Sequence, residues 1–196
     1  MVCTQNCSDY RPLRTHAKQG NMEIARFDAQ RARASLPSLA ELLVDAVDGG
    51  ASMGFMSPFT LEESMAFWDG VVAAVDAGTT ALLVAVDGDV IEGSVQVKFV
   101  PMANQQHRVD ISKLIVHRRA RGRGISTHLM READEVTRSA GRYLMVLDTA
   151  TGSLADSIYP HLGWQQCGII PSYALNPDGS MADATFYWKD LRSPSE

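Results

Sequence analysis

The amino-acid sequence predicts one α/β domain built on a mixed sheet of about six or seven strands. An apolar run at 111–116 leads through a glycine-containing turn into an amphipathic helix at 125–140 and then into a second apolar run at 143–147. Such a β-α-β unit implies two parallel strands joined by a right-handed crossover. The turn Asp87-Gly88-Asp89 lies between two further apolar runs, which is typical of an antiparallel hairpin. With 196 residues, 45% of them hydrophobic, the chain can bury a core of its own.

The chain begins with a polar segment, residues 1–20, that shows no periodicity and is expected to be a flexible extension of the domain at 21–196. Cys3 and Cys7 lie in this extension. Together with Cys167 they are an odd number of cysteines without metal-ligand spacing, so we expect free thiols. A disulfide between the first two, or a metal site, is the alternative.

Two helices are predicted between a first strand at 22–27 and the hairpin. The first begins near Ser35, presents leucine and alanine on one face and ends at paired glycines. The second begins with a capping box, in which the hydroxyl of Thr60 and the carboxylate of Glu63 satisfy first-turn N–H groups reciprocally. The intervening loop, 51–58, contains small residues and two methionines. It either lines a substrate pocket or simply packs.

The C-terminal third of the sequence predicts a strand at 143–147, a short helix at 154–161, a strand at 164–170, a turn-rich loop at 171–179 and a last strand at 184–189. The first of these strands is apolar throughout, which is typical of a strand buried on both faces.

Composition restricts the partners that we expect. The net charge of −5 argues against nucleic acid as the main partner. No apolar run reaches the roughly 20 residues that a membrane-spanning helix needs. The N-terminus lacks the apolar core of a secretory signal, so a cytoplasmic location is expected. The histidines show no metal-ligand spacing, and we expect no metal.

The turn before the central helix combines arginine and glycine, in the order Arg118-Arg119-Ala120-Arg121-Gly122-Arg123-Gly124. A helix N-terminus carries unpaired N–H groups and partial positive charge, and glycine lets an anion approach the backbone. The turn therefore predicts a pyrophosphate site, with a solvated basic loop as the alternative. It lacks the lysine of a Walker loop and the third glycine of a Rossmann loop.

This turn resembles the cofactor loop of the GNAT family of N-acetyltransferases, whose pattern is Gln/Arg-x-x-Gly-x-Gly/Ala after a parallel strand. The pattern is carried by Arg121, Gly124 and Ser126, and the serine departs from the usual Gly or Ala. The resemblance implies acetyl-CoA as cosubstrate. It also implies a mostly antiparallel sheet with about four helices and a central parallel pair that splays where the cofactor enters. The implied cofactor-binding residues are Leu114, Ile115, Val116, Arg121, Gly122, Arg123, Gly124, Ile125, Ser126 and Thr127.

Acetyl transfer to an amine requires a proton acceptor for the amine and a proton donor for the departing thiolate. The segment from Tyr159 to Trp164 resembles the family's Tyr-x-x-x-Gly-aromatic motif, so Tyr159 is the implied acid, with a packing role as the alternative. Asp148 ends the strand at 143–147 and should face the cleft at the strand C-termini, where burial would raise its pKa. It is one candidate base, or else a cap for the next turn. Asp110 is the second candidate base, or else an edge residue.

Four stretches, 42–56, 113–130, 147–153 and 162–179, resemble the tabtoxin-resistance branch of the family. This implies direct N-acetylation of a small amine such as a toxin or an antibiotic. Two alternatives stay open: acetylation of a protein N-terminus or lysine, and a non-catalytic acyl-CoA-binding module. The chain could act as a monomer or as a homodimer.

Overall fold

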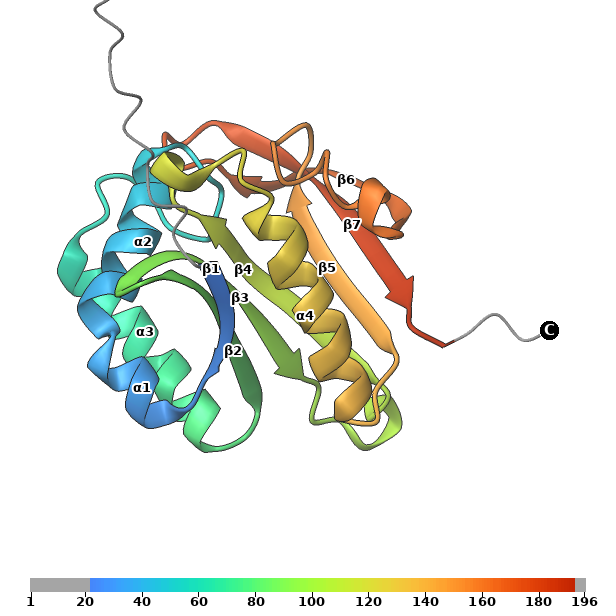
Figure 1. Ribbon diagram of the computed structural model, residues 1–196. Coiled ribbons are helices and arrows are strands. Elements are labelled where there is room, and N and C mark those ends of the chain that lie inside the picture. The colour runs from blue at the N-terminus through green and yellow to red at the C-terminus, as the bar shows by residue number, and fades with distance from the viewer. Residues whose placement is uncertain (1–21, 193–196) are drawn as a thin grey trace, which may run out of the picture.

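The computed structural model describes residues 22–192, in which seven strands form one sheet in the order β1-β2-β3-β4-β5-β7-β6 (Figure 1). The strands are β1 Met22–Phe27, β2 Thr80–Asp87, β3 Val90–Phe99, β4 Arg108–Val116, β5 Leu144–Ala150, β6 Gln165–Leu175 and β7 Met181–Asp190. The α-helices are α1 Ala29–Ala34, α2 Leu36–Asp48, α3 Leu61–Asp76 and α4 Ile125–Ser139. Only β4 and β5 pair in parallel, so the predicted fold class is confirmed. The expected extension at 1–20, with Cys3 and Cys7, lies outside the described residues.

Helices cover both faces of the sheet, and a separate hydrophobic core lies on each side. Figure 1 shows α4 alone across the near face and α1 to α3 grouped together. Leu82 and Val84 of β2 pack with α1 to α3, whereas Leu83 and Ala85 pack with α4. Because successive side chains of a strand point to opposite faces and both faces are covered here, β2 is apolar without interruption from Ala81 to Val86.

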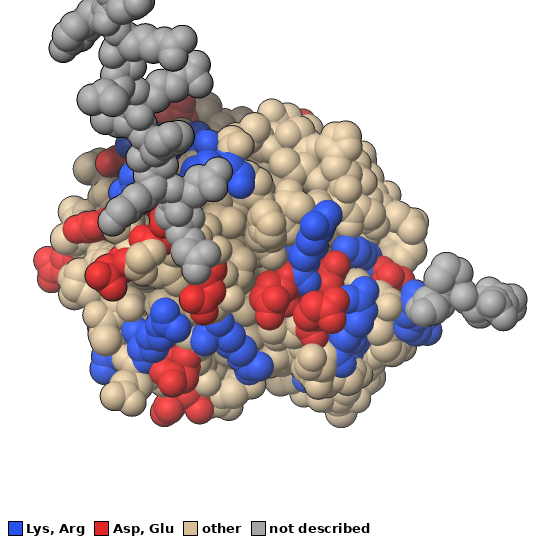
Figure 2. Space-filling view, viewed as in Figure 1, with Lys and Arg blue, Asp and Glu red and all other residues tan. Residues whose placement is uncertain are grey.

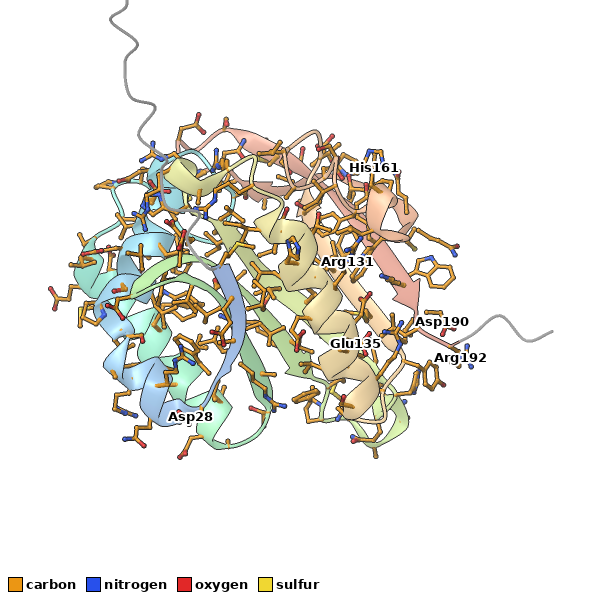
Figure 3. All side chains as sticks on the ribbon, in the orientation of Figure 1. Asp28, Arg131, Glu135, His161, Asp190 and Arg192 are labelled. Atoms are coloured by element: carbon orange, nitrogen blue, oxygen red, sulfur yellow. The ribbon has the colours of Figure 1, made fainter. Side chains whose placement is uncertain are left out.

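Helix α4 is amphipathic because it covers the sheet on one side and meets solvent on the other. Leu129 and Ala133 are fully buried in the core beneath it. Arg131 and Glu135 lie on its exposed face, as the labels in Figure 3 show. Figure 2 shows charged side chains of both signs over the middle and lower part of this face, whereas the upper right of the view is largely uncharged. The apolar period of three to four residues therefore predicted the buried stripe correctly.

The parallel pair separates soon after it forms. Pairing joins Arg108 to Leu144, Val109 to Met145 and Asp110 to Val146, and no further residues of β4 and β5 are paired. A bulge in β4 against β3 accompanies the separation, and Lys113 there has a φ of 53°. The C-terminal halves of the two strands therefore form an open wedge, as the family resemblance implied.

Local signals in the sequence located several elements. The first strand has the predicted bounds. In the capping box the backbone N–H of Thr60 donates to Glu63 Oε2 over 2.8 Å, and the backbone N–H of Glu63 donates to Thr60 Oγ1 over 3.2 Å. Ser35 is the N-cap of α2 and Gly49 its C-cap. Helix α1 was not predicted, since its six residues, AQRARA, carry little apolar periodicity.

The predicted short helix at 154–161 is wrong. The segment consists of turns followed by a 3₁₀ turn at Pro160–Leu162. Pro160 has no N–H to donate into a helix. Gly152 N–H donates to Asp156 Oδ2 over 2.8 Å, and Asp156 N–H donates to Ser153 Oγ over 3.1 Å. These side chains offer the backbone partners other than those of a helix.

Two other predictions about the C-terminal third need correction. The loop expected from Pro171 is still part of β6, which runs to Leu175. Pro171 is tolerated there because β6 is an edge strand with a bulge between Ile170 and Ala174. The strand β5 is not buried on both faces, because its exposure alternates and Asp148 is exposed.

Candidate active site

Two cavities meet in the wedge between β4 and β5. The larger has a volume of about 530 Å³ and extends from β4 to the N-terminus of α4 and the end of α2. The smaller has a volume of about 90 Å³ and lies between β4, β5, β7 and the loop at 51–58. The residues that line both are Ser52, Met53, Leu114, Thr149, Ala150 and Ala155. A molecule in the larger cavity can therefore reach into the smaller one.

The turn before α4 presents backbone N–H groups to the larger cavity. Gly122 and Gly124 have φ angles of 78° and 74°, which glycine adopts without strain. Gly124 is the N-cap of α4 and provides no capping side chain. Within residues 22–192 the N–H groups from Gly122 to Thr127 donate no hydrogen bond. They remain available to an anion at the positive end of the helix dipole.

Most of the residues predicted to bind the cofactor line this cavity. They are Leu114, Ile115, Val116, Arg121, Gly122, Gly124, Ile125 and Ser126. Arg123 and Thr127 were also predicted but are not among the lining residues.

The four arginines of the turn have different roles. Three are joined to carboxylates: Arg118 to Asp45 at 2.8 Å, Arg119 to Glu92 at 2.9 Å and Arg123 to Asp87 at 2.7 Å. These pairs tie the turn to α2, β3 and β2. Arg121 makes no ion pair with the described carboxylates and lines the larger cavity. It is the arginine of the four that can meet a phosphate.

Tyr159 lines the smaller cavity although it does not lie on a helix. Its side chain is 4% exposed, and its ring packs edge-on against Trp164 and beside Tyr187. Burial raises the pKa of its phenol, and the nearby charges of Asp148 and Asp156 raise it further. The hydroxyl therefore stays protonated at neutral pH and can act as a donor. No group in the described chain forms a hydrogen bond with it.

The structure brings Asp148 close to Tyr159 and leaves Asp110 apart. Asp148 lines the smaller cavity from the end of β5. Its side chain is exposed, so the burial that we expected for it is absent. Asp110 lies in the paired part of β4, forms an ion pair with Arg108 at 3.3 Å and is not among the residues lining either cavity.

Lys113 was not predicted as a site residue, yet it lines the smaller cavity. Its Nζ donates to the carbonyl oxygen of Met53 over 2.6 Å and lies 5.3 Å from the ring centres of Phe55 and Phe67. Burial lowers the pKa of the ammonium to about 8; the charge of Lys98 contributes to the lowering and that of Asp148 opposes it. The feature of the sequence that could have identified Lys113 as a site residue is its place as a single lysine within an apolar run.

Residues 22–192 contain neither a candidate metal site nor a helix that could span a membrane. No three His, Cys, Asp or Glu side chains lie close enough together there to hold a metal ion. His161, labelled in Figure 3, lies on the exposed turn after Tyr159. None of the helices in this part of the chain is long and apolar enough to cross a membrane.

Solved acetyltransferase structures share the fold over nearly their whole length. The N-acetyltransferase of Staphylococcus aureus Mu50 is 18% identical, covers 88% of this chain with 99% of its own and has a TM-score of 0.73. The Salmonella typhimurium protein yncA, solved with its cofactor acetyl-CoA, is 19% identical over 90% of this chain and 97% of its own, with a TM-score of 0.71. The ribosomal-protein-alanine N-acetyltransferase of Brucella melitensis is 22% identical over 86% and 99%, with a TM-score of 0.71. These similarities establish the fold.

The sequence model of the Acetyltransferase (GNAT) family matches residues 36–163, which is more than half of the chain. The matched region begins at α2 and includes the arginine-glycine turn, β5 and Tyr159. It therefore contains most of the residues that line the two cavities. The chain belongs to the GNAT family of acetyltransferases.

Proposed function

We propose that the protein transfers the acetyl group of acetyl-CoA directly to the amine of a small molecule. The smaller cavity carries this proposal, because it adjoins the larger one and is bordered by the loop at 51–58 and by Tyr173 and Ala174 of β6. Ser57 N–H donates to Pro177 O over 2.9 Å, and Ser52 Oγ donates to Leu175 O over 3.3 Å. These bonds join the loop at 51–58 to the end of β6 and to the residues just after it. A long polypeptide acceptor would need an open groove at this place, whereas a small amine would not.

The larger cavity suits the phosphorylated part of acetyl-CoA. The free N–H groups from Gly122 to Thr127 and the guanidinium of Arg121 would hold the pyrophosphate. Each hydrogen bond to a charged acceptor contributes about 1.5–3 kcal/mol. A cavity of about 530 Å³ lies within the range of cofactor sites, roughly 300–1,000 Å³.

Asp148 and Tyr159 would perform the proton transfers. Asp148 accepts a proton from the ammonium of the acceptor, directly or through water, because it is the exposed carboxylate at the end of β5. The free amine forms the new C–N bond as the C–S bond breaks, the thiolate leaves, and the nitrogen releases its second proton to water. Asp110 is the weaker candidate base, because its carboxylate is paired with Arg108.

The raised pKa of Tyr159 defines its part in this step. A thiol has a pKa near 8.5, so full transfer of the phenolic proton to the thiolate is unfavourable. The hydroxyl would stabilise the thiolate mainly as a hydrogen-bond donor, and the proton would pass to sulfur as solvent re-enters.

Two measurements test the proposal. Acetyl-CoA should raise the melting temperature of the protein, while ATP and NAD should not. Release of coenzyme A should then be followed with a panel of small amines, starting with tabtoxin-like amino-acid derivatives, and with peptides as the comparison. Turnover confined to small amines supports the proposal. Turnover confined to peptides would overturn it.

Acetylation of a protein N-terminus is the second candidate. A ribosomal-protein-alanine N-acetyltransferase shares the fold, although at 22% identity its substrate does not transfer to this chain. A non-catalytic acyl-CoA-binding module would bind acetyl-CoA and release no coenzyme A with any amine or peptide.

We also propose that the protein forms a homodimer through β6. This edge strand has no charged side chain, and it exposes Ile169, Ile170, Tyr173 and Leu175. Charges, prolines and bulges discourage the pairing of edge strands; β6 lacks charges, and its Pro171 and the bulge beside it follow the stretch Gln165–Ile170, which stays available for pairing. A second copy presents the same edge, which a two-fold axis can pair antiparallel with the first.

A further inference from the structure

The backbone at Lys113 is strained at the point where the wedge opens. A φ of 53° is rare for a residue with a long side chain. The strain falls at the bulge of β4 against β3, where Ser94 Oγ donates to the Lys113 carbonyl over 3.3 Å. Backbone strain of this kind concentrates at functional sites, where the surrounding structure maintains it. Here its effect is to direct the side chain of Lys113 into the smaller cavity.

The ammonium of Lys113 is largely removed from water, yet it forms no ion pair with a carboxylate of residues 22–192. Its single hydrogen bond goes to the carbonyl of Met53, and two aromatic rings lie beside it. An ammonium has three donors, so two of them remain unused. Buried charges in proteins are normally paired. An unpaired one that borders a cavity indicates an anionic partner that binds there.

The charges around the smaller cavity are arranged so that Lys113 and Asp148 remain available. They influence each other electrostatically but form no ion pair. Asp183 is the third charged residue of the lining, and its Oδ1 already accepts from the N–H of Ser172 over 2.8 Å. One cation and two carboxylates therefore border a space of about 90 Å³, and Asp148 is the carboxylate that accepts no hydrogen bond from the described chain.

We propose that the acceptor is a small zwitterion of the amino-acid type, whose ammonium binds at Asp148 and whose carboxylate, or an equivalent anionic group, binds at Lys113. This inference rests on the proposed function and narrows its substrate class. Lys113 acts here as a specificity residue, since it contacts the part of the acceptor that does not react.

Matched acceptors test this inference. Common L-amino acids are each compared with the corresponding carboxamide and with the amine that lacks the carboxyl group. For the preferred amino acid, KM should be about 10- to 100-fold lower than for either analogue, as expected when hydrogen bonds to a charged group are lost. In Lys113→Met this preference should disappear while KM for acetyl-CoA stays unchanged. Lys113→Arg should keep part of it.

Lys98→Met is the matched control. Lys98 influences Lys113 electrostatically but does not line the cavity, so the preference for the carboxylate should survive this substitution. Two results would overturn the inference. One is a wild-type protein that accepts the acid and its carboxamide equally. The other is a Lys113→Met variant that loses activity equally toward all three acceptors. Such a loss would mean that Lys113 only holds the loop at 51–58 in position.

Calorimetry separates this inference from the proposed function. The same ranking of acid over carboxamide should appear when acceptors bind to the protein saturated with coenzyme A. Binding with this ranking but without acetyl transfer would overturn the proposed function and retain the inference. Transfer without the ranking would overturn the inference and retain the function.

Discussion

The phenol of Tyr159 differs from that of its neighbour Tyr187 in what it can reach. Tyr187 donates to Asp156 Oδ1 over 2.8 Å, whereas Tyr159 borders the smaller cavity. Tyr159→Phe keeps the aromatic packing and removes the donor, so kcat should fall by about 100-fold while KM for acetyl-CoA changes little. Steady-state kinetics check this. Tyr187→Phe is the control and should cost about 1 kcal/mol of stability at unchanged kcat. Equal kcat in wild type and Tyr159→Phe would remove Tyr159 from the mechanism.

The buried ammonium of Lys113 should make the folded protein less stable at neutral pH. Its pKa is about 8 in the fold against an ordinary value of 10.5, so the unfolded chain binds more protons between these pH values. Stability should therefore rise with pH from about 8 to 10.5 in the wild type. Lys113→Met lacks this rise, and it should be more stable than wild type below pH 8.

Two effects reduce the gain in stability that we expect from Lys113→Met. A lowering of about 2.5 pKa units (10.5 − 8) corresponds to at most about 3 kcal/mol. Partial exposure of the ammonium and loss of the bond to Met53 reduce the expected gain to about 1–2 kcal/mol. Urea unfolding at pH 7 and pH 10.5 measures it. A variant that is less stable than wild type at both pH values would contradict the expected cost of burying the charge.

The position of a site residue was predictable where it depends on local sequence. Short motifs and positions at strand or helix ends indicated Tyr159, Asp148 and Arg121, and all three line one of the two cavities. The ion pairs of the other arginines were not predictable, since their carboxylate partners lie 27, 36 and 73 residues away along the chain. Lys113 was not predicted as a site residue, because a bulge directs its side chain into the cavity. The alternation of apolar and polar residues along a strand does not reveal such a bulge.

At the scale of elements, the N-terminus of α4 should bind the pyrophosphate only while its backbone keeps a left-handed residue. Gly124 has a φ of 74°, and an added Cβ would contact His128 without a clash. Gly124→Ala should therefore cost about 1–2 kcal/mol through backbone strain and weaken acetyl-CoA binding about 10-fold or more as the turn relaxes. Calorimetry measures both wild type and variant.

Gly78→Ala provides the matched control for that experiment. Gly78 has a φ of 68°, has open space around it and lies after α3, outside the lining of either cavity. It should lose similar stability and keep its affinity for acetyl-CoA. Equal affinities in wild type, Gly78→Ala and Gly124→Ala would refute the role of the turn.

The contact of β3 with β4 and α4 depends on Gly93. A Cβ there would lie 2.7 Å from the carbonyl oxygen of Ile115 and 3.2 Å from a methyl carbon of Ile125. Gly93→Ala should lower the free energy of unfolding by about 1–3 kcal/mol, because neither β4 nor α4 can move without repacking. Gly168→Ala in β6 is the control, since nothing lies within 4 Å of its added Cβ. Urea unfolding should separate the two variants, and equal stabilities would show that β3 has room to shift.

Helices and strands were predictable where residues within them or directly beside them mark their ends. The capping box of α3 and the turn before β3 depend on neighbouring residues. The segment at 154–161 and the end of β6 depend on competition, since the side chains of Ser153 and Asp156 replace helical bonds and an edge position makes Pro171 harmless. Such competition is resolved by tertiary contacts that no short window of sequence contains.

At the scale of the whole molecule, part of the sheet order follows from connections that the sequence reveals. The hairpin predicts that β2 and β3 are neighbours, and the crossover helix predicts that β4 and β5 pair in parallel. The insertion of β7 between β5 and β6 was not predictable, because it depends on which edge the last strand finds. The smaller cavity requires this insertion, since Ala182 and Asp183 of β7 form part of its wall.

The uncharged edge of β6 gives the last prediction, which concerns assembly. Ile169 and Ile170 are 48% and 45% exposed, and Tyr173 from the same strand lines the smaller cavity. If β6 pairs with its copy, Ile170→Lys places a charge in the interface and should convert a dimer to a monomer in sedimentation velocity. Val90→Lys is the control, because Val90 is 46% exposed at the opposite side of the sheet, in the hairpin. It should remain dimeric. A wild-type protein that sediments as a monomer at the concentrations used in assays would rule out the dimer and leave each acceptor cavity to act alone.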